Sequence, residues 1–92
     1  MKYDIELTEL ALDGIKTFRK SGDLQALKKL NKLLTELEEH PTTGTGQVEP
    51  LKGDKSGLWS RRITGKHRLI YSINDTEIKV LVISTYGHYE DK

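Results

Sequence analysis

The segment GTGQVEPLKGDKSGLWSRRITGKHRLIY, residues 44–71, is the part of the chain around which the rest is organised. It starts as a glycine-rich turn, passes a lone carboxylate at Glu49 and ends in a basic hairpin. Between Glu49 and Arg68 there are six lysines and arginines but only two acids. A carboxylate inside a basic strip is unusual for a purely solvated surface. It suits a site that binds a polyanion and also needs a base.

The composition of the chain limits its class. With 92 residues it is expected to form one domain, residues 1–92. It has no cysteine, which excludes disulfides and thiolate metal sites, and no apolar run approaches the ~20 residues of a membrane span. The N-terminus is not a signal peptide, so we expect a cytoplasmic protein without a membrane partner. The net charge is only +1, and the basic excess is therefore a focused patch.

The first part of the chain predicts one strand and two helices. Alternation of apolar and polar residues over 2–7 is typical of a half-buried strand. Thr8 can cap the first helix, which Ser21-Gly22 ends. In the second helix, leucines recur every three or four residues from 24 to 37. Asp23 can cap that helix, and its charged face reads as a solvated surface.

The last third of the chain predicts a sheet. Apolar runs over 58–64 and 67–73 flank the short turn Gly65-Lys66, whose glycine can adopt positive φ, and a third run spans 78–83. The result is an α+β fold: an N-terminal strand, a two-helix hairpin, then three or four antiparallel strands, with the helices packed on one sheet face.

The hairpin carries three arginines that could hold a phosphate in a planar, two-pronged contact. Arg61 and Arg62 lie on one strand and Arg68 on the other. With a two-residue turn, Arg61 shares a face with Arg68, whereas a shift of one residue in register puts Arg62 there instead. The sequence leaves both alternatives open.

Histidine occurs three times, at His40, His67 and His88. Because the three are scattered, with no carboxylate at a fixed spacing, we predict no metal site and no cofactor. His88 follows the last strand and can reach a site built on the sheet, whereas His40 and His67 are expected to be structural or exposed.

Together, Glu49, Arg68 and His88 predict a metal-free ribonuclease. The carboxylate takes the proton of a ribose 2′-hydroxyl, whose oxygen attacks the adjacent phosphorus. The arginine stabilises the charge that develops, and the imidazole protonates the departing 5′-oxygen. Histidine suits this role because the free side chain titrates near neutrality. Such a cut requires RNA and leaves a 2′,3′-cyclic phosphate, while Tyr86, Tyr89 or Trp59 could stack on a base. For Trp59, packing within the fold is the preferred interpretation.

These residues resemble a known family. The motifs EPLK (49–52), SGLWSRRI (56–63), HRLIY (67–71) and GHY (87–89) are similar, in this order, to those of the YoeB toxins of the RelE superfamily. The resemblance implies a RelE-like fold and a bacterial type II toxin that cuts mRNA in the ribosomal A site. It further implies a Phd/YefM-type antitoxin, the capacity to form a homodimer, and binding to operator DNA only as a toxin–antitoxin complex.

By the same resemblance, Glu49 is the general base, Arg68 stabilises the transition state and His88 is the general acid. Tyr89 is expected to position the substrate, and Lys52 and Arg62 are expected to contact RNA, with Arg61 as the alternative to Arg62 set by the register.

The chain departs from the family pattern in three places. Tyr86 stands where family members commonly carry arginine, Lys66 stands where an acid often precedes the His-Arg pair, and residues 90–92 extend beyond the usual end. The first two departures put the details of phosphate contact in question and leave the catalytic trio intact.

Two other functions fit the same fold. A ParE-like toxin would bind DNA gyrase without RNA chemistry, but the joint presence of Glu49 and His88 argues against it. A non-catalytic RNA- or operator-binding module would bind without producing a cyclic phosphate.

Overall fold

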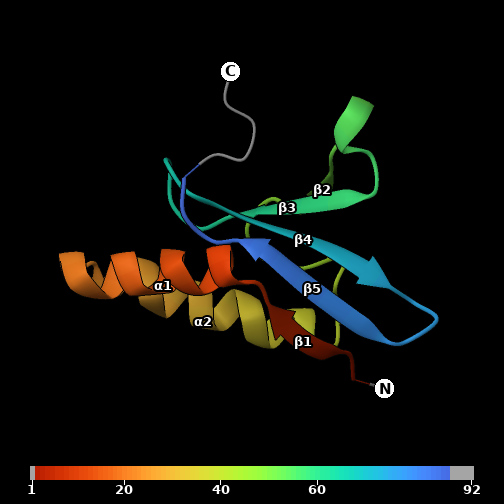
Figure 1. Cartoon of the computed structure of the whole chain (residues 1–92), viewed down its shortest axis with the longest axis horizontal. Helices are drawn as coiled ribbons and strands as arrows, with labels where there is room; N and C mark the ends of the chain where they lie inside the picture. Colours follow the sequence, from red (N-terminus) through yellow and green to blue (C-terminus); the bar gives the residue numbers. More distant parts are fainter. Residues whose placement is uncertain (1, 88–92) are drawn as a thin grey trace.

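The computed structural model describes residues 2–87. Figure 1 shows the order of the elements along the chain. They are β1 (Asp4–Leu7), α1 (Glu9–Ser21), α2 (Leu24–Leu37), β2 (Glu49–Pro50), the 3₁₀ turn η1 (Gly53–Lys55), β3 (Leu58–Arg62), β4 (Arg68–Asn74) and β5 (Lys79–Ser84).

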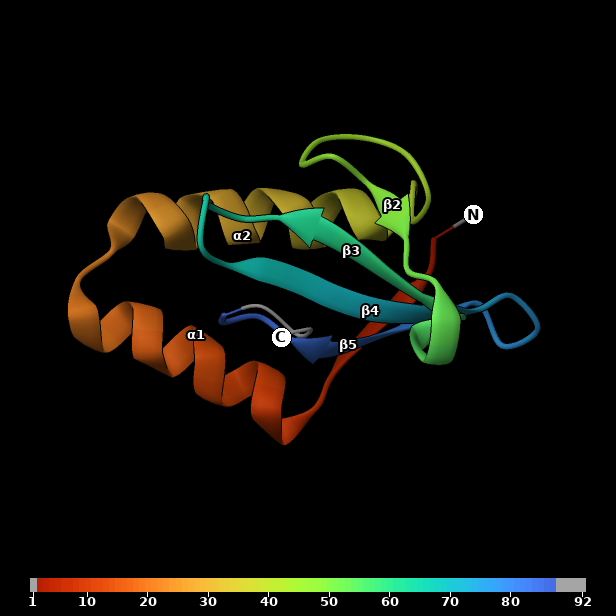
Figure 2. The same ribbon diagram turned by 90° about the horizontal axis from the view of Figure 1, so that it is seen from above.

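The strands form one five-stranded sheet in the order β1-β5-β4-β3-β2. The neighbours from β5 to β2 are antiparallel, whereas β1 runs parallel to β5. Both helices lie against the same face of this sheet (Figures 1 and 2). The predicted α+β order of strand, two helices and sheet is confirmed. The N-terminal strand joins the sheet as its parallel edge, and the two-residue β2 forms the opposite edge.

The helix boundaries follow local capping chemistry. The hydroxyl of Thr8 accepts the backbone N–H of Ala11 at 3.1 Å, and the carboxylate of Asp23 accepts that of Ala26 at 3.1 Å. Gly22 ends α1 in the left-handed conformation, with φ 73°. These predicted caps are confirmed. Within residues 2–87, neither helix combines the length and the apolarity that crossing a membrane requires.

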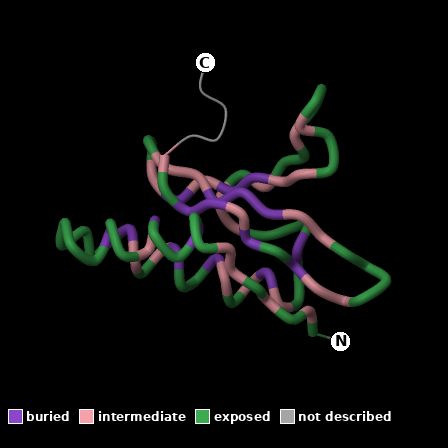
Figure 3. Tube along the Cα trace, in the orientation of Figure 1, coloured by how far each residue is buried: buried purple, intermediate pink, exposed green. Residues whose placement is uncertain are grey.

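The core lies between the helices and the sheet, where Figure 3 shows the buried positions of both layers. Leucines and Phe18 from the helices pack against Leu69, Tyr71, Val80 and Val82 from the central strands. Trp59 packs against this core as well, as preferred from the sequence. Neither α1 nor α2 covers the opposite face of the sheet, which is called the open face below (Figure 1). Ser60 and Ile70 on this face are nevertheless buried.

The β3–β4 connection differs from the prediction. Arg62 pairs with Arg68, so the register is shifted by one residue from that of a two-residue Gly65-Lys66 turn. The hydroxyl of Thr64 accepts the N–H groups of both Lys66 and His67, which draws Thr64 into the loop. Gly65 does not adopt positive φ. The two-residue turn was wrong because a threonine side chain competes with the ladder for these donors.

The burial of two leucines on α2 predicts how much stability the protein loses when each is truncated to alanine. Leu33→Ala removes a side chain that is 0 % exposed, and it should lower the free energy of unfolding by about 2–5 kcal/mol. Leu24→Ala, at a position that is 71 % exposed on the same helix, should change it by less than about 0.5 kcal/mol. Denaturant titration of both variants measures the difference. Equal losses would contradict the placement of the core.

Candidate active site

The face of the sheet away from the helices brings Glu49 and Arg68 together. Glu49 pairs with Ser60 across β2 and β3, and Ser60 in turn pairs with Ile70, two residues after Arg68 on β4. Directly paired residues in an antiparallel sheet point to the same side. The side chains accordingly meet: the carboxylate of Glu49 lies 3.7 Å from Nη1 of Arg68, which is also 3.4 Å from the hydroxyl of Ser60.

Both contacts of the Arg68 guanidinium are long. At 3.7 Å the ion pair is an electrostatic contact without hydrogen-bond geometry, and 3.4 Å is beyond the usual range for a strong hydrogen bond. The Glu49 side chain is 55 % exposed and that of Arg68 is 24 % exposed. Because these contacts within the described chain are long, the Arg68 guanidinium can exchange them for an incoming anion, and the exposed Glu49 carboxylate can accept a proton from a bound ligand.

The register decides between the two arginines of β3. Arg62 lies opposite Arg68 and shares the open face, whereas Arg61 lies opposite Leu69 on the helix side. Within the described chain, Nε of Arg62 is buried and has no hydrogen-bond partner. A buried donor without a partner is costly, so this N–H group is suited to donate a hydrogen bond to a ligand oxygen or to water.

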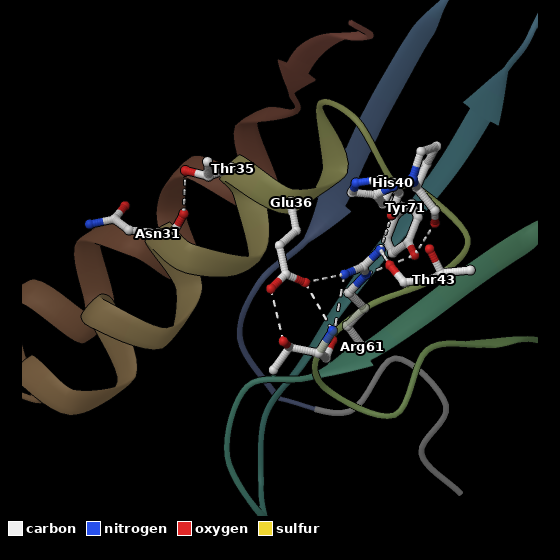
Figure 4. Close-up of polar contacts among 9 residues, drawn as sticks. Asn31, Thr35, Glu36, His40, Thr43, Arg61 and Tyr71 are labelled. Carbon is white, nitrogen blue, oxygen red and sulfur yellow. Dashed lines mark hydrogen bonds and ion pairs between the residues drawn. The ribbon is translucent and has the colours of Figure 1, made fainter. Parts of the chain in front are cut away.

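Arg61 is fully buried and cannot reach a substrate on the open face. Its guanidinium donates to Glu36 at 2.9 Å, to Tyr71 at 3.1 Å and to backbone carbonyls of residues 40, 43 and 45 (Figure 4). The expectation that Arg61 contacts substrate does not fit these contacts, because all of its donor groups face inward toward protein oxygens.

The C-terminal site residues His88 and Tyr89 lie outside the described residues, while the peptide before them is described. The Gly87 N–H donates to Nδ1 of His67 at 2.8 Å, and the Gly87 carbonyl accepts the N–H of Arg68 at 3.0 Å. The His67 ring packs edge-on against Phe18 with centroids 5.1 Å apart. His67 thus has the structural role expected of it, and it fixes the end of the described chain beside Arg68.

The remaining candidates are peripheral to the Glu49–Arg68 pair. Lys52 is exposed, two residues after β2. Tyr86, which is 48 % exposed, packs its ring against His67 and Phe18. Within residues 2–87, no three histidine or acidic side chains are grouped closely enough to hold a metal ion.

Glu36 was not anticipated as more than part of a solvated helix face. Its carboxylate accepts the Thr45 N–H at 2.9 Å and the Thr45 hydroxyl at 2.8 Å, besides its pairing with Arg61. A signal was present in the sequence: Trp59, Arg61 and Ile63 alternate on one face, so a charge had to enter the apolar side of β3. Such a charge requires a buried partner.

Several solved structures with this fold are bacterial toxins. A YoeB/ParE toxin from Agrobacterium tumefaciens is 34 % identical, with a TM-score of 0.86 over 94 % of this chain and 99 % of its own. A YoeB dimer from Staphylococcus aureus is 31 % identical, with a TM-score of 0.82 over 97 % of this chain and 100 % of its own. The same toxin in a heterotetrameric complex with YefM gives a TM-score of 0.80, at the same identity and coverage. The class is therefore that of the YoeB/RelE-type toxins.

Sequence comparison narrows the class to one family. The family model for YoeB-like toxins of bacterial type II toxin–antitoxin systems matches residues 8–89. Toxin YoeB from Synechocystis is 41 % identical over 86 residues, which are 94 % of this chain and 96 % of that protein. This chain belongs to the YoeB-like toxins of type II toxin–antitoxin systems, as its motifs predicted.

The charge of Glu36 predicts that the stability of the protein depends on pH. Burial raises the pKa of the Glu36 carboxyl, but hydrogen bonds from Thr45 and the charges of Arg61 and Lys32 outweigh burial, so the net pKa is lowered. A lowered pKa in the folded state stabilises the protein above the ordinary carboxyl range, and this stability is lost as the pH falls through the lowered value. Glu36→Gln should therefore reduce the melting temperature at pH about 7 and much less at pH about 3.

Thermal unfolding of the two proteins across this range makes the measurement. An equal deficit at both pH values would show that the carboxylate charge contributes nothing. Glu77→Gln is the matched control, since Glu77 is an exposed acid near the β4–β5 turn.

Proposed function

We propose that this toxin is an endoribonuclease that cuts mRNA in the ribosomal A site by metal-free acid–base chemistry. The observation that carries the proposal is the Glu49–Arg68 contact of 3.7 Å on the open face of the sheet, in a chain of the YoeB family. A candidate base, Glu49, and a candidate anion-binding group, Arg68, lie side by side there, and the contacts that hold the arginine within the described chain are long.

In the proposed reaction, Glu49 removes the proton of the 2′-hydroxyl, and the resulting oxygen attacks the neighbouring phosphorus. Arg68 donates to the equatorial oxygens as negative charge builds up on them. His88 gives its proton to the 5′-oxygen, which leaves as a hydroxyl, and the other fragment ends in a 2′,3′-cyclic phosphate. The hydrogen bond between Gly87 and Arg68 supports the role of His88, because it brings the chain to the arginine one residue earlier.

RNA contacts extend the proposal beyond the trio. Arg62 lies beside Arg68 and has a buried Nε in need of a partner, which supports a phosphate contact. Lys52 is exposed beyond β2 and can add a screened attraction to the backbone. Tyr89 is proposed to position the substrate base by stacking, as the family motif implies.

The ribosome supplies what the protein surface lacks. The net charge is only +1, so free RNA should be held weakly, and the ribosome is proposed to provide binding energy and substrate orientation. A YefM-type antitoxin is proposed to neutralise the toxin in the cytoplasm. The S. aureus relative, which has been solved in complex with YefM, supports this partner.

Substitution of the acid–base residues tests the chemistry. Glu49→Gln and His88→Gln should each lower cleavage of ribosome-bound mRNA by about 10²–10⁴-fold, because each removes a proton transfer. Arg68→Lys keeps a charge but loses the planar donor pair and should show a comparable loss. Single-turnover cleavage, with detection of the cyclic phosphate, is the measurement. Full activity of all three variants would refute the assignment.

Ribosome dependence is a separate prediction. Cleavage of the same mRNA at physiological salt should be at least about 10²-fold slower without ribosomes, since positioning of reacting groups contributes at least this much. A gyrase supercoiling assay with the same preparation serves as the counter-test. Inhibition of gyrase without cleavage of RNA would favour the ParE-like alternative.

A further inference from the structure

The buried guanidinium of Arg61 holds one particular segment of the chain. It donates to the carbonyls of His40, Thr43 and Thr45, and its Nε donates to the hydroxyl of Tyr71. That hydroxyl in turn donates to the carbonyl of Pro41 at 2.6 Å. Burial raises the pKa of Tyr71, so the phenol keeps the proton that it donates. Four carbonyls between residues 40 and 45 are thus held, directly or through Tyr71, by one side chain of β3.

Glu36 fixes the same segment from the side of α2. Its carboxylate accepts both the N–H and the hydroxyl of Thr45 while it pairs with Arg61. Figure 4 shows Glu36 reaching from the helix toward Arg61 on the strand. The fit is close: a Cβ at Gly44, where φ is +123°, would lie 2.6 Å from the Glu36 carboxylate. The segment therefore has a single path between helix and strand.

This segment leads to Glu49. Between α2 and β2 the chain has no helix or strand, and the Gly46 carbonyl accepts the N–H of Arg62 just before β2 begins. The strand β2 has two residues and, within the described chain, pairs with β3 alone. So short an edge strand has little ladder of its own. The position of Glu49, three residues after Gly46, therefore depends on the path of the segment 40–45.

Fold stability alone does not require a charge at position 61. A buried ion pair often contributes no more than well-packed apolar residues of similar volume would. What an apolar side chain cannot do is bind carbonyl oxygens and thereby fix an irregular loop. Arg61 also stands between Ser60 and Arg62, which lie on the open face. One strand thus presents site residues on one side and holds the loop that carries the base on the other.

We infer that Arg61 and Glu36 are positioning residues for the general base: their buried pair sets the loop that places Glu49 against Arg68. This inference rests on the proposed ribonuclease function. It assigns no contact with RNA to either residue, and it predicts that both act on the rate of reaction through Glu49.

The test compares steady-state cleavage of ribosome-bound mRNA by single and double variants. Arg61→Met keeps an unbranched apolar stem in place of the arginine but removes the guanidinium and all its donors. It should lower kcat by about 10–100-fold and change KM by less than about 3-fold, because a misplaced reacting group affects the rate more than binding. Arg61→Lys, which keeps the charge and can bind some of the carbonyls, should recover part of the loss.

The decisive measurement is a double-mutant cycle. In a Glu49→Gln background, Arg61→Met should reduce kcat by less than about 2-fold, since the group through which Arg61 acts is already absent. Multiplicative losses would overturn the inference, as would a rise in KM at unchanged kcat. Amide exchange should quicken at Thr45 and stay unchanged at Val82, which separates local release of the loop from general unfolding.

Thr45→Val covers the case in which Arg61→Met does not fold. It removes only the hydroxyl contact with Glu36, and it should lower kcat by about 3–10-fold, again without further effect in the Glu49→Gln background. Wild-type kcat for Thr45→Val would overturn the inference. Lys79→Met is the matched control: it breaks a surface ion pair with Glu6, on the far edge of the sheet, and should leave kcat unchanged.

The outcomes separate this inference from the proposed function. If Glu49→Gln retains wild-type kcat, the proposed chemistry is wrong and the inference falls with it. If Glu49→Gln is inactive while Arg61→Met and Thr45→Val are fully active, the chemistry stands and the inference alone is refuted.

Discussion

A guanidinium that is completely removed from water must find both a counter-charge and acceptors for its N–H groups. In this toxin Arg61 finds the charge in Glu36 and the acceptors in the loop after α2. The path of that loop between α2 and β2 follows these contacts, and the inferred positioning of Glu49 rests on them. The loop is irregular but not arbitrary, because the carbonyls of His40, Pro41, Thr43 and Thr45 accept hydrogen bonds from Arg61 or Tyr71.

The alternation of side chains along β3 explains why Arg61, and not Arg62, makes these buried contacts. Successive residues of a strand point to opposite faces, so Arg61 and Arg62 face different environments although they are adjacent in sequence. Arg61 is 0 % exposed and held by protein oxygens, whereas Arg62 shares the open face with Arg68 and has a buried Nε without a partner among residues 2–87. A shift of one residue in the hairpin would exchange these environments.

Features with a local cause could be predicted from the sequence. Thr8, Gly22 and Asp23 mark the helix ends through hydrogen bonds to nearby backbone groups, and they do so in the structure as expected. The register of the hairpin could not be predicted, because it depends on whether the Thr64 hydroxyl binds loop N–H groups or leaves them to the ladder. The parallel pairing of β1 with β5 joins distant parts of the chain and has no local signature.

The candidate site divides in the same way. The proximity of Glu49 and Arg68 could be anticipated from family motifs and hairpin geometry, and the structure places them in contact. The role of Glu36 could not be anticipated, because on a helical wheel Glu36 lies on the charged side of α2 with its neighbours. Only the odd position of Arg61 between Trp59 and Ile63 pointed to a partner, and it did not say which acid that partner would be.

Two glutamate–arginine pairs of this molecule have the same chemistry but differ in burial and distance, and therefore in the role each can have. The Glu36–Arg61 pair is 2.9 Å apart, its arginine is buried, and its remaining donors are bound, so breaking it would leave a charge without solvent. The Glu49–Arg68 pair is 3.7 Å apart and partly solvated, so water and counter-ions screen it and its partners can separate at small cost. A structural pair needs the first property. The proposed role of the Glu49–Arg68 pair, to admit a phosphodiester between its members, needs the second, because a contact already closed to hydrogen-bond distance would have to be broken before an anion could enter.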